Sequence, residues 1–150
     1  MNSWKAITLF SVMMLVCMSL VNCSCTAVEK TERIESNGFK WYELKQDGFC
    51  GAKDGDGKTL IPVSRNYDFI CYVTTNGGWF LVEKAGKAGA CDNDGNEMIS
   101  PTKYESLSYR NEAGKEFFYA VLNGKTGICN KRGEEFYYCT WDNNGIYPQE

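Results

Sequence analysis

A period of 38 residues runs through most of this chain and limits the folds open to it. The segments that begin at Trp41, Trp79 and Phe117 align on one another without gaps. Three sets of glycines keep the same spacing, namely Gly48, Gly86 and Gly124, then Gly51, Gly89 and Gly127, then Gly57, Gly95 and Gly133. A fixed period in this range is typical of architectures built from repeated supersecondary units.

Each aligned segment predicts a strand, a tight turn, a second strand, a second turn and a third strand. Alternating apolar and polar side chains indicate the first strand. Asp47-Gly48 and Asn123-Gly124 are pairs preferred in two-residue hairpin turns, because both positions need a positive φ. A glycine recurs inside the second strand, at Gly51 in the first segment, which predicts that a ring or a neighbouring backbone lies close to it. We expect the third strand to end at Pro62 or Pro101, because Pro has no amide donor.

The first strand of each segment has two faces with different expected roles. We assign the face of Tyr42 and Leu44, Phe80 and Val82, and Phe118 and Ala120 to the core. The opposite face begins with Trp41, Trp79 and Phe117. In the third segment that face is wholly apolar, with Phe117, Tyr119 and Val121, which predicts a strand covered on both sides.

These features predict an all-β fold of three tandem ~38-residue β-meander units, stacked as an open or solenoid-like single domain over residues 38–150. An aromatic-acid pair follows the third strand in each unit, at Tyr67-Asp68, Tyr104-Glu105 and Trp141-Asp142. A fourth strand is expected at Phe69–Val73 in the first unit, and the third unit ends unfinished after Asp142. Closure into a propeller is not expected, since propellers need about 4–8 blades.

The pattern resembles the WG-repeat family, whose units read approximately G-x-W-G, then D-x-x-G-x-x-x-I-P, then an aromatic-Asp pair. The matching stretches are Gly48–Gly51, Gly86–Gly89 and Gly124–Gly127, followed by Asp56-Gly57 with Ile61-Pro62 and by Asp94-Gly95 with Ile99 and Pro101. The family Trp is replaced by Cys50, Ala88 and Thr126, so the chain resembles a degenerate member. The resemblance implies tandem β-rich units of an exported bacterial protein, and it brings no catalytic residues.

The amino terminus predicts export. Lys5 precedes an apolar run that reaches about Val21, the layout of a secretory signal, which we assign to residues 1–22. Two processing routes remain open, namely lipidation of Cys23, favoured because Leu20–Cys23 resembles a lipobox, or cleavage after Ala27. Residues 23–37 are polar and are expected to form a tether without a fold of its own. The expected location is an outer-membrane or periplasm-facing lipoprotein, or otherwise a secreted or periplasmic protein.

The cysteines and the acidic turns are candidate sites. Cys91 and Cys129 occupy the same repeat position, so stacked units could bring them together as a disulfide. Two half-buried apolar side chains are the favoured interpretation. Asp54–Gly57 and Asp92–Gly95 resemble calcium loops, but the other ligand positions of an EF-hand do not match. Solvated hairpin turns are therefore favoured, and we expect no metal and no cofactor.

The remaining features favour a binding role over an enzymatic one. The chain contains no His and has a net charge of −3, so the commonest general base is absent and nucleic acid is not an expected partner. Trp41, Trp79 and Phe117 could align as an aromatic column that binds glycan or peptide, or could pack inside the domain. We predict a non-enzymatic module that binds protein or glycan at the bacterial cell envelope, with the membrane contacted through the lipid anchor only. The alternatives are a structural spacer without a ligand and, disfavoured, a hydrolase.

Overall fold

The structure, a computed structural model, describes residues 26–74 and 78–142, with side-chain surroundings given as far as residue 136. These residues form β-strands and one short 3-10 helix and contain no α-helix, so the all-β prediction is confirmed. The strands are β1 (Glu29–Ile34), β2 (Lys40–Gln46), β3 (Phe49–Asp54), β4 (Thr59–Ile61), β5 (Phe69–Val73), β6 (Trp79–Lys84), β7 (Lys87–Cys91), β8 (Glu97–Tyr104), β9 (Ser106–Glu112), β10 (Lys115–Leu122), β11 (Lys125–Cys129) and β12 (Glu135–Asp142), and the 3-10 helix η1 is Val63–Arg65. Within the described ranges, no helix is long and apolar enough to serve as a membrane span.

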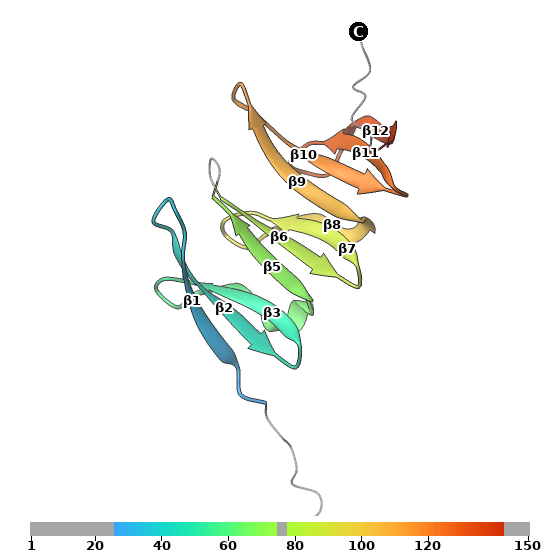
Figure 1. Cartoon of the computed structure of the whole chain (residues 1–150). Helices are drawn as coiled ribbons and strands as arrows, with labels where there is room; N and C mark the ends of the chain where they lie inside the picture. Colours follow the sequence, from blue (N-terminus) through green and yellow to red (C-terminus); the bar gives the residue numbers. More distant parts are fainter. Residues whose placement is uncertain (1–25, 75–77, 143–150) are drawn as a thin grey trace, which may run out of the picture.

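The strands form three antiparallel four-stranded sheets, which we name A, B and C. Sheet A has the order β1-β2-β3-β4, sheet B the order β5-β6-β7-β8, and sheet C the order β9-β10-β11-β12. Strands that follow one another in the chain are neighbours in each sheet, so every sheet is a meander with two edges. Figure 1 shows the sheets one above another, with A at the amino-terminal end and C at the carboxyl-terminal end.

Two apolar cores hold the sheets together. The core between sheets A and B contains Trp41 and Ile61 from one side and Phe80 and Val82 from the other. The core between sheets B and C joins residues of both sheets, namely Trp79, Ala88, Ala90, Ile99, Tyr104, Leu107, Tyr109, Phe118, Ala120 and Cys129. Sheet B is therefore covered on both faces, and the predicted core positions Phe80, Val82, Phe118 and Ala120 are buried. In sheet A, Leu44 is also buried, but the core assignment of Tyr42 is wrong, because Tyr42 is only half-buried and its neighbour Trp41 enters the core instead.

Each four-stranded sheet begins one strand earlier in the chain than predicted. The expected tether, residues 23–37, contains β1, which pairs with β2 along its whole length and places Arg33 opposite Trp41. In the same way Phe69–Val73, predicted to complete the first unit, is β5 and pairs with β6 of the next sheet. The prediction of an unstructured tether is thus wrong for residues 29–34. The backbone amides and carbonyls of β1 form hydrogen bonds with β2, and this pairing does not require β1 to bury an apolar side chain.

The two-residue hairpin turns and the acidic turns both have the predicted geometry. Asp47 and Gly48 have φ values of 53° and 83°, and Asn123 and Gly124 have 53° and 70°, as a two-residue hairpin of this class requires. In the acidic turn the Asp54 Oδ1 atom accepts the amides of Asp56 (3.0 Å) and Lys58 (2.8 Å).

The other two acidic turns repeat this arrangement with different chemistry. Asp92 accepts two amides, at 3.0 and 2.8 Å, and Asn130 does the same at 2.8 and 3.0 Å. Because the neutral Asn130 amide oxygen serves as well as a carboxylate, these turns need an acceptor and not a charge. The hairpin-turn interpretation is confirmed.

The recurrent glycine in the second strand admits a neighbouring backbone. A Cβ atom added to Gly51 would lie 2.7 Å from the Ile61 carbonyl oxygen, and one added to Gly89 would lie 2.5 Å from that of Ile99. The prediction of a close approach is confirmed, with backbone as the neighbour. Pro62 does precede η1, but Pro101 lies inside β8, which contradicts its expected role as a strand end. β8 tolerates Pro101 because it is an edge strand with an irregular register.

The aromatic-acid pairs connect each sheet to the next. The Tyr67 hydroxyl donates to Glu97 of β8 (2.5 Å), and the Tyr104 hydroxyl donates to Glu135 of β12 (2.9 Å). The acid that follows each Tyr accepts from the amides of the next hairpin turn. Asp68 accepts from Ala85 (2.6 Å), and Glu105 accepts from Asn123 and Gly124, at 2.9 and 3.1 Å. The pairs therefore stabilise both the contact between sheets and the turn of the following sheet.

The turn chemistry can be tested at Asp54. Asp54→Ala removes the acceptor of two backbone amides and should lower the free energy of unfolding by about 1–2 kcal/mol, at about 1 kcal/mol for each hydrogen bond. Asp54→Asn is the matched control, since Asn130 performs this role in the third turn. Urea unfolding of both variants measures the difference. Equal losses in the two variants would show that the charge, and not the acceptor, stabilises the turn.

Candidate functional site

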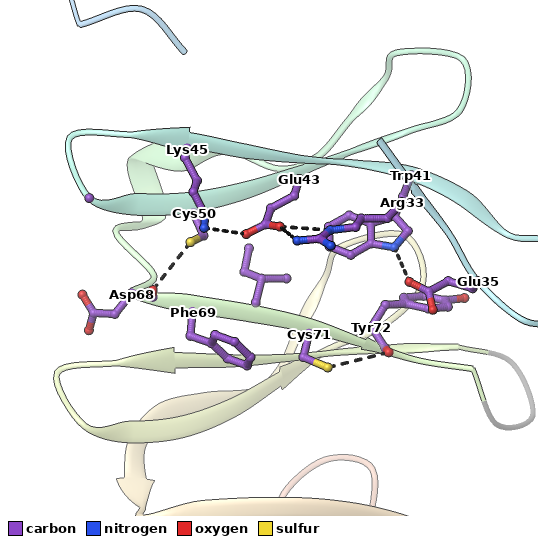
Figure 2. Close-up of a pocket in the computed structure, with 12 residues that line it drawn as sticks. Arg33, Glu35, Trp41, Glu43, Lys45, Cys50, Asp68, Phe69, Cys71 and Tyr72 are labelled. Atoms are coloured by element: carbon purple, nitrogen blue, oxygen red, sulfur yellow. Dashed lines mark hydrogen bonds and ion pairs between the residues drawn. The ribbon is translucent and has the colours of Figure 1, made fainter. Parts of the chain in front are cut away.

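A groove of about 600 Å³ opens between sheets A and B on the side of β1 and β5 (Figure 2). Sheet A contributes charged side chains from β1 and β2, among them Arg33, Glu43 and Lys45. Sheet B contributes one continuous stretch, Asp68 to Tyr72. We take this groove as the candidate site because it joins fixed charges, thiols and an accessible strand in one concave surface.

The edge of β5 forms one wall of the groove. Successive side chains of a strand point to opposite faces of its sheet, so a surface lined by five consecutive residues is lined by the strand edge. β5 is the first strand of sheet B and pairs only with β6. Its sequence, Phe-Ile-Cys-Tyr-Val, contains no charge and no Pro, and the Phe69 ring is 49% exposed. Edges of this kind are open to pairing with another strand.

The opposite wall is organised around a buried carboxylate. Glu43 is only 8% exposed, and its Oε2 atom accepts two hydrogen bonds from Arg33, at 2.6 and 3.2 Å. Lys45 lies 3.4 Å from the other carboxylate oxygen. Burial alone would raise the pKa of Glu43, but the hydrogen bond from Arg33 and the charge of Lys45 outweigh it and hold that pKa below its usual value. Glu43 is thus an ionised group held by two cations.

Two cysteines line the same groove. The Cys50 thiol is buried and donates to the Asp68 carbonyl oxygen (3.5 Å), and the Cys71 thiol is exposed and donates to the Tyr72 carbonyl oxygen (3.8 Å). Burial is the main cause that raises the pKa of both thiols. Since the thiolate is the reactive form of Cys, neither side chain is activated as a nucleophile.

The proposed aromatic column does not form a ligand platform. Trp41 and Trp79 are 3% and 6% exposed and lie in the two cores between sheets. The Trp41 Nε1 atom donates to Glu35 (2.6 Å), and the Trp79 ring packs edge-on against Phe118 at 5.3 Å. The third member, Phe117, is half-buried on the outer face of sheet C. Trp41 and Trp79 therefore pack inside the domain, which was the alternative to a ligand-binding column.

Cys91 and Cys129 do not form a disulfide, in line with the favoured interpretation of apolar side chains. Both side chains are buried, but Cys91 lies in the core between sheets A and B and Cys129 lies in the core between sheets B and C. Equivalent positions in successive sheets are separated by a whole sheet when both side chains point the same way. Burial is the main cause that raises the pKa of the Cys91 thiol to about 11.

Cys23 and the whole of residues 1–22 lie outside the described residues. Among residues 26–74 and 78–142, no cluster of three or more Cys, Asp or Glu side chains is arranged to hold a metal ion.

Comparison of the chain with models of protein families, with curated proteins and with solved structures found no significant match. Membership of the WG-repeat family therefore stays a prediction. The site is interpreted from its own geometry alone.

Sequence reasoning missed most of the groove. Arg33 and Glu35 lie in residues 23–37, which the sequence predicts to be a tether, and nothing in the sequence singles out Glu43. One signal is present in the sequence, since the predicted strand Phe69–Val73 carries no charge. What the sequence did not indicate is that this strand is the first of its sheet and therefore an edge.

The ion pair between Arg33 and Glu43 can be tested by replacing it with the apolar pair that occupies the same positions in sheet B, Val73 and Leu81. Arg33 lies opposite Trp41 and Val73 opposite Trp79, while Glu43 lies opposite Ala52 and Leu81 opposite Ala90. Arg33→Val should lower the free energy of unfolding by about 1–2 kcal/mol, a reduced value because Arg33 is half exposed. Adding Glu43→Leu to Arg33→Val should restore the free energy of unfolding, since an apolar pair can replace a buried ion pair without loss of stability.

The same variants give a pH dependence with a defined sign. The folded-state pKa of Glu43 is lowered, so its stabilisation is present above the unfolded pKa and is lost as pH falls through the folded pKa. Urea unfolding of the wild type should therefore show an acid-labile component that the double variant lacks. Identical pH profiles would contradict this assignment.

Proposed function

We propose that this protein is a non-enzymatic binding module of the bacterial cell envelope that takes up an extended peptide segment of a protein partner along the edge of β5. The observation that carries the proposal is the uncharged edge strand that forms one wall of the groove between sheets A and B. A peptide added there would extend sheet B by one strand, with main-chain hydrogen bonds giving affinity and side-chain contacts giving selectivity.

The geometry supports a protein partner over a glycan. A glycan was expected on an aromatic column, and its two Trp rings are buried. The groove instead offers a strand edge and the exposed Phe69 ring. Its rim carries two cations and three carboxylates, namely Arg33, Lys45, Glu35, Glu43 and Asp68. A peptide with an apolar residue for Phe69 and one basic residue for the carboxylates fits this surface.

The geometry also supports a non-enzymatic role. Glu43 is ionised and bound by two cations, and the Cys50 and Cys71 thiols are protonated at neutral pH because burial raises their pKa values. Acid-base catalysis and nucleophilic attack both need a group with a pKa near the working pH. A structural spacer without a ligand is the second candidate function.

We propose further that the three sheets are tandem copies of one unit, stacked in an open, solenoid-like array. This is supported by the recurrence of the turn hydrogen bonds at Asp54, Asp92 and Asn130 and of the Tyr-Glu contacts between sheets. The resemblance to WG repeats and the signal-like residues 1–22 support export, with Cys23 as the lipidated residue.

Peptide binding can be tested with one charge on the edge strand. Linear peptides are selected from a phage-displayed library on the purified full chain, and their Kd values are measured by fluorescence anisotropy. Cys71→Lys places a charge on an exposed edge position and should weaken binding about tenfold, a loss of about 1.4 kcal/mol, because edge lysines oppose strand addition. Ser108→Lys is the matched control, since Ser108 of β9 lies opposite Tyr119 as Cys71 lies opposite Leu81.

Three results would contradict the proposal. A selection that yields no peptide would favour the structural spacer. Equal weakening by Cys71→Lys and Ser108→Lys would place the site elsewhere. Binding on a glycan array that survives Cys71→Lys would favour a sugar ligand.

The lipid anchor has a separate test. Intact mass spectrometry of the protein extracted from bacterial membranes should show a diacyl or triacyl mass on Cys23. A first residue at Val28 would instead establish cleavage after Ala27.

A further inference from the structure

A second hollow, of about 710 Å³, lies between sheets A and B on the side of β8. It is lined by Ser64 and Arg65 of η1, by the β6–β7 hairpin and by residues of β8 that include Ser100. The groove described above lies at β5, so the two openings are at opposite edges of sheet B. The hairpin contributes Lys84 and Lys87 to the lining. Three cations therefore share one concave surface.

The two lysines of the hairpin stand directly opposite each other. Lys84 and Lys87 are cross-strand partners at the end of β6 and β7. Since side chains two residues apart share a sheet face, Lys84 points to the same side as Val82, which sheet A covers. Like charges directly opposite each other destabilise a strand pair. Sheet C has Leu122 and Lys125 at these two positions, so the fold of the hairpin does not require paired lysines.

Arg65 brings a third positive charge to the hairpin. Its Nη1 atom donates to the Gly95 carbonyl oxygen (2.7 Å) and to the Cys91 thiol (3.8 Å), and its own carbonyl oxygen accepts from the Lys84 Nζ atom (2.8 Å). These acceptors are neutral, so the hydrogen bonds position the cations without neutralising them. Among the residues that the structure describes, Arg65, Lys84 and Lys87 form no ion pair.

The carboxylates around the hollow have other partners. Glu97 lines the hollow and accepts the Tyr67 hydroxyl (2.5 Å). Asp68 accepts the Ala85 amide of the hairpin turn (2.6 Å), and Asp92 accepts two amides of its own turn. The three cations therefore exceed the carboxylate charge that lines the hollow.

The interface between sheets B and C pairs its charges differently. Lys103 stands there in the place of Arg65 and forms an ion pair with Glu135, the counterpart of Glu97. Glu135 accepts the Tyr104 hydroxyl as well. The cation before the Tyr is thus paired in one interface and unpaired in the other, so the charge of the hollow is specific to sheets A and B.

We propose that this hollow binds the phosphate group of a small phosphomonoester. Lys84 and Lys87 supply two point charges, and the Arg65 guanidinium has N–H donors beyond the one already bonded. The hydroxyls of Ser64 and Ser100 line the same surface. A phosphate bound there would relieve the repulsion between the paired lysines. The volume of the hollow is in the range of small-molecule sites.

Phosphate binding can be tested at Lys87. The full isotope-labelled chain is titrated with inorganic phosphate at constant ionic strength, and the amide chemical shifts give the Kd. Saturable shifts are expected at Ala85 and Ser100. Lys87→Gln should weaken binding about tenfold, because one charge-assisted hydrogen bond is lost. Lys125→Gln is the matched control and should bind phosphate as the wild type does, since it removes the same charge from the equivalent hairpin of sheet C.

Three results would overturn the proposal. The first is the lack of saturable shifts in the wild type. The second is equal weakening by Lys87→Gln and Lys125→Gln, which would show attraction to the overall charge of the protein and no defined site. The third is a Kd for acetate as low as that for phosphate. Peptide binding at β5 does not depend on any of these results, because that groove lies at the other edge of sheet B.

The source of the phosphate group has its own test. The wild type and Lys87→Gln are titrated with glycerol phosphate and sedimented with vesicles of equimolar phosphatidylcholine and phosphatidic acid. Binding of glycerol phosphate that Lys87→Gln weakens would support a soluble phosphomonoester as the ligand. Sedimentation with the vesicles that Lys87→Gln abolishes, without binding of glycerol phosphate, would instead place a lipid head group in the hollow and overturn the soluble ligand.

Discussion

Burial of apolar sheet faces against a neighbouring sheet is the constraint on which the rest of this structure depends. A four-stranded meander of this size encloses no core of its own. Sheet B buries Phe80 and Val82 on one face and Ala90 and Ile99 on the other, all at most 4% exposed. At about 25 cal/mol for each Å² of apolar surface removed from water, these contacts are the main stabilising contribution between sheets.

Polar contacts set how the sheets meet. The Tyr67 and Tyr104 hydroxyls each reach a Glu of the next sheet, so the apolar ring lies in the core while its polar end has a partner. The acid after each Tyr holds the first hairpin turn of that next sheet, at Ala85 or Asn123. One dipeptide thus couples a contact between sheets to the geometry of a turn.

Much of the local structure could be predicted because it depends on neighbours in the chain. β6 begins at Trp79, where the repeated pattern predicts the start of a strand, and the turn at Asn123 has the positive φ that an Asn-Gly pair implies. The close backbone approach at Gly89 followed from a glycine in a strand. The candidate site was far less accessible, because Arg33 and Phe69 are distant in sequence and meet only through the packing of sheet A on sheet B.

The sequence by itself determined that the chain is β-structured, where most strands and turns lie, and that the units share one pattern. Tertiary structure decided which strands share a sheet, which faces are buried and where the edges lie. β1 joins β2 although all of its residues are exposed, and Trp41 is buried although its strand alternates as a half-exposed strand does. The physical reason is that periodicity reports the two faces of a strand, whereas only packing determines whether another sheet covers each face.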